Sequence, residues 1–369
     1  MTDKCLQLPF FIRASIFFIG LIAFVAILYI AQGIIVPLVF SVILAILLHP
    51  AVNFFGRIGI NRIVAIVLTL LLTSLVLASC FILIFSQASQ FWESWPLLVD
   101  KFTSTLNQFI TDIAGYLELK PQIIHDWITK SKGELLHFSN EAIGQTLLSV
   151  GNGLMILLLI PVYIFLILFY HPLLIEFLHR LFKASNHLQV SEMVTQIKTV
   201  IQRYLFGLVI EAFLVASLNT AALLLLGIEY ALLIGIIGAL LNLIPYIGGL
   251  VAVALPMIIA LATKSSAWFA FYVLGSYYFI QLIDNNYIVP YIVASKVKIN
   301  ALFSIIVVFV GNAIWGIPGM FLSIPLLAIL KLFFDHIEPL KPWGFLLGDS
   351  MPSLLTIKPI IKKILKPDS

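Results

Sequence analysis

Long uninterrupted apolar runs set the strongest constraint on what this chain can fold into. They lie at residues 14–31, 33–49, 62–86, 149–170, 204–227, 231–262, 266–283 and 301–334. A helix needs about 20 residues to cross the ~30 Å hydrocarbon core of a bilayer, and each run is close to that length or longer. Of the 369 residues, 62% are hydrophobic and only 10% are charged. The sequence therefore predicts an all-α integral membrane protein with about eight transmembrane segments.

Two breaks in the apolar pattern predict the domain organisation. Residues 87–148 carry seven Asp and Glu against four Lys, and we expect them to form a small helical extramembrane insert. Residues 173–182 alternate apolar and polar side chains at helical spacing, which favours a helix lying on the membrane surface. The expected parts are N-terminal membrane helices (1–86), an extracytoplasmic insert (87–148), a membrane helix (149–170), a cytoplasmic amphipathic segment (171–203), a membrane core with broken or re-entrant helices (204–338) and a cytoplasmic tail (339–369).

The placement of Lys and Arg predicts the orientation, because cytoplasmic loops carry an excess of these residues. Residues 50–62 hold Arg57 and Arg62 without an acid, and the C-terminal tail is rich in Lys. Both termini are therefore expected in the cytoplasm and the acidic insert outside. The number of crossings in the C-terminal half stays open, because the run at 231–262 can either cross once or re-enter.

Several common enzyme motifs do not occur in this sequence. It has no His-Glu-x-x-His, no Gly-x-Ser-x-Gly and no phosphate-binding glycine loop. Its two cysteines, Cys5 and Cys80, are too few for a disulfide framework or a metal cluster. We therefore expect no enzyme activity, no catalytic residue, no cofactor, no metal and no direct use of ATP. His49 and His171 each precede a Pro at a predicted membrane edge, which we interpret as snorkelling or capping.

The stretch "ALLNLIPYIGGLVAVALP" at 239–256 is uncharged but punctuated by residues that interrupt a helix. Pro245 frees a backbone carbonyl, and in lipid such a break is tolerated only where the backbone is buried or lines a cavity. Discontinuous helices of this kind form binding sites in many transporters, whereas the alternative is a packing kink in which Gly248 and Gly249 allow close helix contact. "WGIPGMFLSIP" at 315–325 echoes the pattern, either as a structural repeat or by chance.

Several polar residues fall within apolar segments, where a charge costs about 2.5–3.5 kcal/mol. Glu211 and Asn219 share one helix face with Gly207 and Val215, at a spacing of four residues. Glu211 can carry a coupling proton or cation, or it can pair with Arg203 or a neighbouring helix. The segment "QLIDNNYIVP" at 281–290 is either a solvated loop or a segment that dips back into the membrane, and Asn312 is a weaker candidate.

These residues carry a resemblance to the autoinducer-2 exporter family of bacterial membrane proteins. The chain matches an Asn-x-Ile-Pro-Tyr-x-Gly block at 242–248, an Asp-Asn-x-x-x-x-Pro block at 284–290 and a Gly-Ile-x-Gly-x-x-x-x-x-Pro block at 316–325. The resemblance covers about residues 10–338 and is tightest over 200–334. Where the family often has Pro near position 300, this chain has Asn300-Ala301. Glu211 is not part of these blocks.

The resemblance implies a polytopic transporter of the bacterial inner membrane that exports a small polar solute such as autoinducer-2. Coupling to H⁺ or Na⁺, and assembly as a homo-oligomer such as a pentamer, are implied on family grounds, and we expect lipid but no nucleic acid as a partner. The alternatives are a Na⁺(Li⁺)/H⁺ antiporter, a passive channel and a membrane scaffold whose insert binds an outside partner. The predicted pathway residues are Glu211, Asn219, Asn242, Pro245, Tyr246, Gly248, Gly249, Gln281, Asp284, Asn285, Asn286, Pro290 and Asn312.

Overall fold

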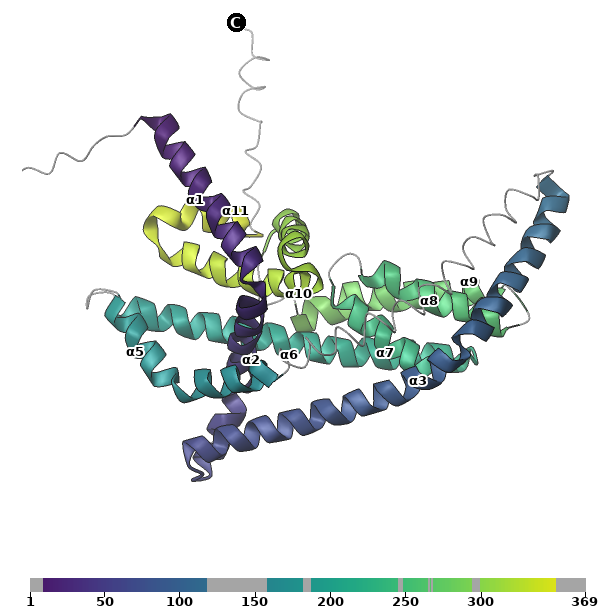
Figure 1. Cartoon of the computed structure of the whole chain (residues 1–369), viewed down its shortest axis with the longest axis horizontal. Coiled ribbons are helices and arrows are strands. Elements are labelled where there is room, and N and C mark those ends of the chain that lie inside the picture. The colour runs from purple at the N-terminus through teal and green to yellow at the C-terminus, as the bar shows by residue number, and fades with distance from the viewer. Residues whose placement is uncertain are drawn as a thin grey trace, which may run out of the picture.

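The computed structural model describes residues 9–117, 158–181, 187–244, 248–264, 266, 268–293 and 299–349. Apart from one isolated bridge between Ile299 and Gly348, the regular structure in these ranges is helical. The elements are α1 (Phe10–Ile30), α2 (Gln32–Arg57), α3 (Arg62–Leu117), α5 (His171–Leu181), α6 (His187–Leu225), α7 (Ala231–Asn242), α8 (Gly248–Thr263), α9 (Trp268–Ile283), the π-helix η2 (Asp284–Val293), α10 (Ala301–His336), the 3-10 turn η4 (Glu338–Leu340) and α11 (Lys341–Leu347). A further helical segment spans Leu158–Phe169. In Figure 1, α3 and α6 run lengthwise, and α1 and α2 cross them near one end.

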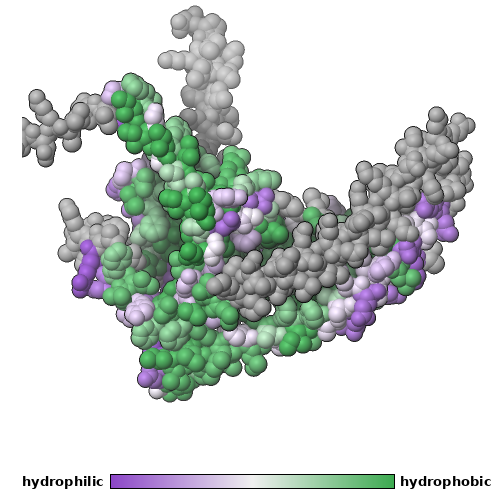
Figure 2. All heavy atoms as spheres, viewed as in Figure 1, coloured by the Kyte–Doolittle hydropathy of each residue, from purple (hydrophilic) through white to green (hydrophobic). Residues whose placement is uncertain are grey.

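The outer surface of these helices is apolar, as a lipid environment requires. None of the 21 residues of α1 is buried, although the helix is almost entirely hydrophobic. Figure 2 shows hydrophobic side chains covering α1, α2 and the first part of α3, whereas hydrophilic ones gather toward the far end of α3. Water would not tolerate so much exposed apolar surface on a folded monomer. The prediction of an all-α integral membrane protein is confirmed.

By length and composition alone, which take no account of a reversal within a helix, five of the described helices could cross a membrane. They are α1, α2, the Arg62–Thr105 part of α3, the Ser191–Leu225 part of α6, and α10. The segment Leu158–Phe169 adds a sixth if it is taken together with the start of α5, from which it is bent by 63°. The run at 231–262 is divided into two shorter helices, α7 and α8. The expected total of about eight segments therefore stays a prediction.

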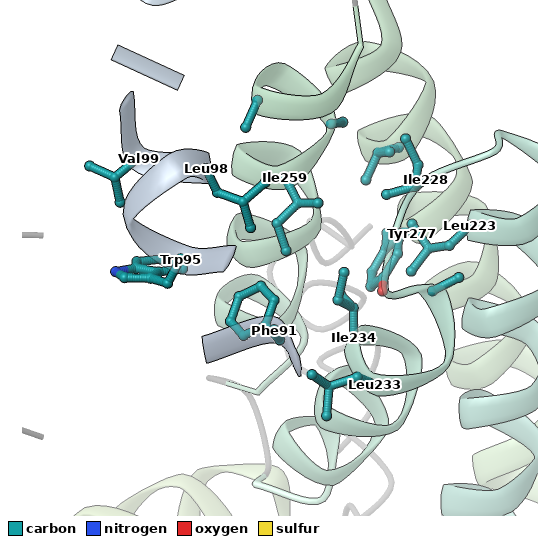
Figure 3. Packing of buried hydrophobic residues seen from close by; sticks show 14 residues of the cluster. Phe91, Trp95, Leu98, Val99, Leu223, Ile228, Leu233, Ile234, Ile259 and Tyr277 are labelled. Atoms are coloured by element: carbon teal, nitrogen blue, oxygen red, sulfur yellow. The ribbon is translucent and has the colours of Figure 1, made fainter. Parts of the chain in front are cut away.

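Helix α3 passes the predicted start of the insert at residue 87 without a break, and continues to Leu117. Beyond residue 86 its first turns pack into the largest hydrophobic cluster of the described residues. In this cluster Phe91, Trp95 and Leu98 of α3 meet Leu223, Ile234, Ile259 and Tyr277 of α6, α7, α8 and α9 (Figure 3). The beginning of the insert is thus joined to the C-terminal helices by apolar packing, while residues 118–148 of the insert lie outside the described ranges.

Helix α10 contains a reversal at Gly316, whose backbone has φ 64° and ψ −143°. Few residues other than glycine adopt this conformation. On either side of it the two halves lie against each other, because the Ser323 Oγ donates to the carbonyl oxygen of Val307, 16 residues earlier, at 2.9 Å. A Cβ added at Gly319 would overlap the backbone of Gly311. α10 is therefore a helical hairpin with its turn near Gly316.

The segment that begins at Asp284 is not a loop. Residues Asp284–Val293 form a π-helix that continues α9 directly. The wider π turn accommodates Pro290, whose missing N–H removes one donor of the helical ladder. Of the two expectations for this stretch, the solvated loop is wrong. The segment packs along α6 through Ile288, which lies in one buried cluster with Val215 and Ala239.

Two further expectations concern segments outside the predicted membrane helices. Residues 171–181 form the short helix α5, which begins next to the predicted membrane edge and carries an exposed ion pair between Arg180 and Glu176. The predicted tail begins with η4 and α11, and Asn300 N donates to Leu347 O at 2.9 Å. The tail up to residue 349 is therefore docked on the start of α10.

Candidate functional site

The face of α6 that was predicted from a spacing of four residues is turned into the protein. Gly207, Glu211, Val215 and Asn219 are all buried, with Glu211 5% and Asn219 3% exposed. Helix α6 holds them in register because residues four apart lie one above the other on a helix. Two strongly polar side chains are thus withdrawn from both water and lipid, two helical turns apart.

The carboxyl group of Asp284 lies at the centre of a second group of polar side chains. Asp284 is 2% exposed and is the first residue of η2. Asn242, the last residue of α7, donates from Nδ2 to Asp284 Oδ2 at 2.8 Å. Gln281 Nε2 lies 3.4 Å from the same oxygen and 3.3 Å from Asn285 Oδ1. The helix end at Asn242 and the change of helix type at Asp284 therefore meet at one place.

Glycines let the helices of this region approach closely. A Cβ at Gly249 would lie 2.7 Å from Gln281 Oε1, and one at Gly248 would lie 2.8 Å from the Cα of Asn242. On α7, a Cβ at Gly238 would lie 3.2 Å from Asn219 Nδ2 and 3.4 Å from the Tyr277 hydroxyl. The glycines at 238, 248 and 249 thus bring the polar side chains of α6, α7 and α9 together.

Sequence reasoning missed Thr220 and Tyr277. A Cβ at Gly235 would lie 2.8 Å from the backbone N of Thr220, and the Tyr277 hydroxyl lies beside Gly238 and Asn219. Tyr277 precedes Gln281 by four residues and Asp284 by seven, so all three share one helix face. This periodicity was visible in the sequence, but an aromatic residue in an apolar helix is an ordinary packing residue and gave no further signal.

These side chains form a polar row inside the protein, made of Thr220, Asn219, Tyr277, Gln281, Asn242, Asp284 and Glu211. The row begins where Thr220 meets Gly235 and ends where Glu211 and Asp284 lie close enough for their charges to interact. The nine positions from Glu211 to Thr220 on α6 correspond to roughly 13 Å at ~1.5 Å per residue. Apolar contacts of Val215 with Ala239 and Ile288 lie within this length.

Several oxygen atoms in the row have no hydrogen-bond partner among the described residues. They are Asn219 Oδ1, Thr220 Oγ1, the Tyr277 hydroxyl and Asp284 Oδ1. Buried polar atoms are normally paired, so such a concentration in one row is unusual. In the described part of the chain no ion pair joins Glu211 to Arg203, the structural alternative for Glu211. Acceptor oxygens and two carboxyl groups suit a proton, a cation or a donor-rich solute.

The remaining predicted residues are placed as follows. Pro245 and Tyr246 lie outside the described residues. Asn285, Asn286 and Pro290 belong to η2 but are exposed, and Asn286 Nδ2 donates to the Leu282 carbonyl instead of to the cluster. Asn312 is exposed on α10, and no hydrogen bond within the described ranges links it to the polar row. Within those ranges there is also no group of three or more His, Cys, Asp or Glu that could hold a metal ion.

A multi-pass helical membrane protein with broken helices around a buried polar row has the architecture of a membrane transporter. The family comparison identifies which kind. The family model described as AI-2E family transporter matches residues 18–338, and the chain therefore belongs to the AI-2E transporter family.

Individual relatives are similar to this chain over most of their length. The AI-2 transport protein TqsA of Escherichia coli strain K12 is 25% identical over 330 residues, which cover 86% of this chain and 90% of TqsA. YrrI of Bacillus subtilis strain 168 is 22% identical over 313 residues, covering 83% and 87%. PerM of Escherichia coli strain K12 is 25% identical over 325 residues, covering 84% and 89%. The name of TqsA states a substrate, whereas the names of YrrI and PerM do not.

Proposed function

We propose that this transporter moves a small polar solute such as autoinducer-2 out of the cell across the bacterial inner membrane, and that the carboxyl groups of Glu211 and Asp284 couple this movement to H⁺ or Na⁺. The observation that carries the proposal is the burial of both carboxyl groups, with Asp284 bonded to Asn242 at the end of α7 and Glu211 within range of its charge. The name of TqsA supports the choice of solute.

The carboxyl pair supports ion coupling for an electrostatic reason. Two ionised carboxylates whose charges interact in a low-dielectric interior repel each other, and each also loses its hydration. Binding of a proton or a Na⁺ to one of them lowers both costs. No Lys or Arg of the described chain forms an ion pair with either group, so the compensating charge is free to exchange.

The unpaired oxygens of the polar row support a hydroxyl-rich solute. Asn219 Oδ1, the Tyr277 hydroxyl and Asp284 Oδ1 are acceptors without partners among the described residues, and a solute that carries several O–H donors would pair with them. Gly238 and Gly249 keep the neighbouring backbone close to these atoms. The proposed pathway follows the row from Thr220 to Glu211 and Asp284. Cytoplasmic termini and a homo-oligomeric assembly are further parts of the proposal.

The test is flux in vesicles reconstituted with the purified protein, using labelled autoinducer-2 in one set and Na⁺ in another, each with and without a proton gradient. The variants are Glu211→Gln and Asp284→Asn, which remove charge at nearly constant size. The matched control is Glu229→Gln. Glu229, like Glu211, lies among apolar residues in the sequence, but in the structure it is exposed. Size-exclusion elution checks that each variant is folded.

Autoinducer-2 flux that depends on the gradient, and that is lost in both site variants but kept in Glu229→Gln, supports the proposal. Na⁺ exchange without autoinducer-2 flux would contradict the proposal and indicate a cation antiporter. Flux of either solute that does not depend on the gradient would contradict it and indicate a passive channel. Absence of flux of both solutes from folded wild-type protein refutes the choice of substrate and ion.

A further inference from the structure

A basic cavity lies well away from the polar row, where α2 ends and α3 begins. Its volume is about 520 Å³, and its polar lining comes from His49, Asn53, Arg57, Arg62 and His171. These residues belong to α2, α3 and the start of α5, so three separate elements build the cavity. None of the residues that line it is an Asp or a Glu.

The hydrogen bonds of His49 define what this side chain offers to the cavity. Its Nδ1 atom lies 3.0 Å from the ammonium nitrogen of Lys198 and 3.1 Å from Asn53 Nδ2. An ammonium group can only donate, so Nδ1 must accept and Nε2 must carry the proton. His49 is therefore a neutral ring whose Nε2–H has no hydrogen-bond partner among the described residues, and its contact holds the Lys198 cation of α6 beside the cavity. The ring of His171 lies against it, with the centroids 4.9 Å apart.

The two arginines add further donors. One terminal nitrogen of Arg62 donates to the carbonyl of Leu168 at 2.8 Å, which holds the guanidinium in place while its other N–H groups stay available. Arg57 lies on the last turn of α2 and is exposed. The carboxylate on the adjoining helix α5, Glu176, is bound to Arg180 Nε at 2.9 Å. The lining thus combines guanidinium and imidazole groups without a carboxylate, and the Lys198 ammonium lies behind it in contact with His49.

We propose that this cavity binds a phosphate group. Like charges gathered without a counter-charge are unfavourable unless an anion neutralises them, and guanidinium groups match the oxygens of phosphate in geometry. The inference does not depend on the proposed transport function, because none of the residues that carry it belongs to the polar row.

The position of the cavity allows two sources for the phosphate. It lies at the ends of two membrane-spanning helices, where the headgroup of an anionic phospholipid would meet it. A small soluble phosphate would reach the same donors from the aqueous side. Both use the same chemistry, and separate arms of one experiment distinguish them.

The experiment uses the full-length protein purified in neutral detergent. Equilibrium dialysis against radiolabelled inorganic phosphate measures binding of the free ion, and native mass spectrometry after addition of phosphatidylglycerol counts bound lipid. The variants are Arg57→Gln and Lys198→Gln, and the matched control is Arg203→Gln. Arg203 is an exposed arginine of α6 five residues from Lys198 and, unlike Lys198, it has no hydrogen bond to a lining residue in the described part of the chain.

Loss of a charge-assisted hydrogen bond worth about 1.5–3 kcal/mol lowers binding by roughly tenfold or more. We expect that loss in Arg57→Gln and Lys198→Gln, with Arg203→Gln close to wild type. Loss in the dialysis arm identifies a soluble phosphate, and loss in the mass-spectrometry arm identifies a lipid headgroup. The proposal is overturned if folded wild-type protein binds neither probe. It is also overturned if all three variants bind as tightly as wild type, or if all three lose affinity to the same extent.

Discussion

Replacing Gly319 by Ala tests the hairpin of α10 directly. The added Cβ would lie 2.6 Å from the carbonyl carbon of Gly311, and ordinary contact begins near 3.4 Å. The carbonyl oxygen of Gly311 lies closer still, so the two halves of the hairpin would have to separate by more than the ~0.8 Å between these two values. Both atoms of Gly311 belong to the backbone, so no side-chain rotation can relieve the overlap. Such overpacking costs about 1–3 kcal/mol, and the loss of the Ser323 hydrogen bond to Val307 adds about 1 kcal/mol.

The measurement is the free energy of unfolding, obtained by titrating the protein in mixed detergent micelles with SDS. Gly275→Ala is the control, because Gly275 lies inside α9 and a Cβ there meets nothing within 4 Å. Replacing an unobstructed helical glycine by alanine stabilises by about 0.5–1 kcal/mol. We therefore expect the two substitutions to shift stability in opposite directions. Equal stability of Gly319→Ala and Gly275→Ala would mean that α10 does not fold back at Gly316.

Two further substitutions test the packing of the C-terminal helices, and one tests a surface contact, all by the same unfolding assay. Phe91→Ala empties part of the cluster that joins α3 to α8, and should destabilise by about 3–5 kcal/mol, whereas a change near zero would place α3 away from this cluster. Gly235→Ala brings a Cβ within 2.8 Å of the Thr220 backbone and should cost about 1–3 kcal/mol, unlike Gly33→Ala, which meets nothing. Arg180→Gln should cost no more than about 0.5 kcal/mol, because its ion pair with Glu176 is exposed; a larger loss would mean that α5 is more tightly held than its exposure indicates.

The sequence was most informative where burial imposes a regular spacing. The face of α6 that carries Glu211 and Asn219 follows from the four-residue period, and the structure buries both side chains. The end of α7 at Asn242 follows from the Pro and Gly residues just after it. Both signals are local, since a helix face and a helix break depend only on residues a few positions apart.

Contacts between distant segments could not be predicted in this way. The bond between Asn242 and Asp284 joins residues 42 positions apart, and the ring contact of His49 with His171 joins two elements that are separated by the predicted insert. Each histidine alone resembled an ordinary residue at a membrane edge. A basic cavity emerged only when the fold brought them together with Lys198, because a pattern within one helix carries no information about its neighbours.

The ends of α10 carry information about membrane topology. A straight helix of 36 residues would place Ala301 and His336 on opposite sides of the membrane. The backbone instead joins Ile299 to Gly348 in an isolated bridge. The elements between His336 and Gly348 are a single 3-10 turn and the seven-residue α11, which spans only about 10 Å and cannot recross the bilayer. The chain therefore enters and leaves α10 on the same side, as the hairpin at Gly316 requires.

Residues that flank the bridge should therefore be accessible from one side of the membrane only, and both from the same side. Ala301→Cys and Asp349→Cys suit the test, because both positions are exposed. Each is introduced after Cys5 and Cys80 are replaced by Ser, and each is labelled with a membrane-impermeant maleimide in sealed right-side-out and inverted vesicles. We expect both cysteines to react in the same vesicle orientation. Reaction in opposite orientations would make α10 a single crossing, and would contradict both the hairpin and the bridge between Ile299 and Gly348.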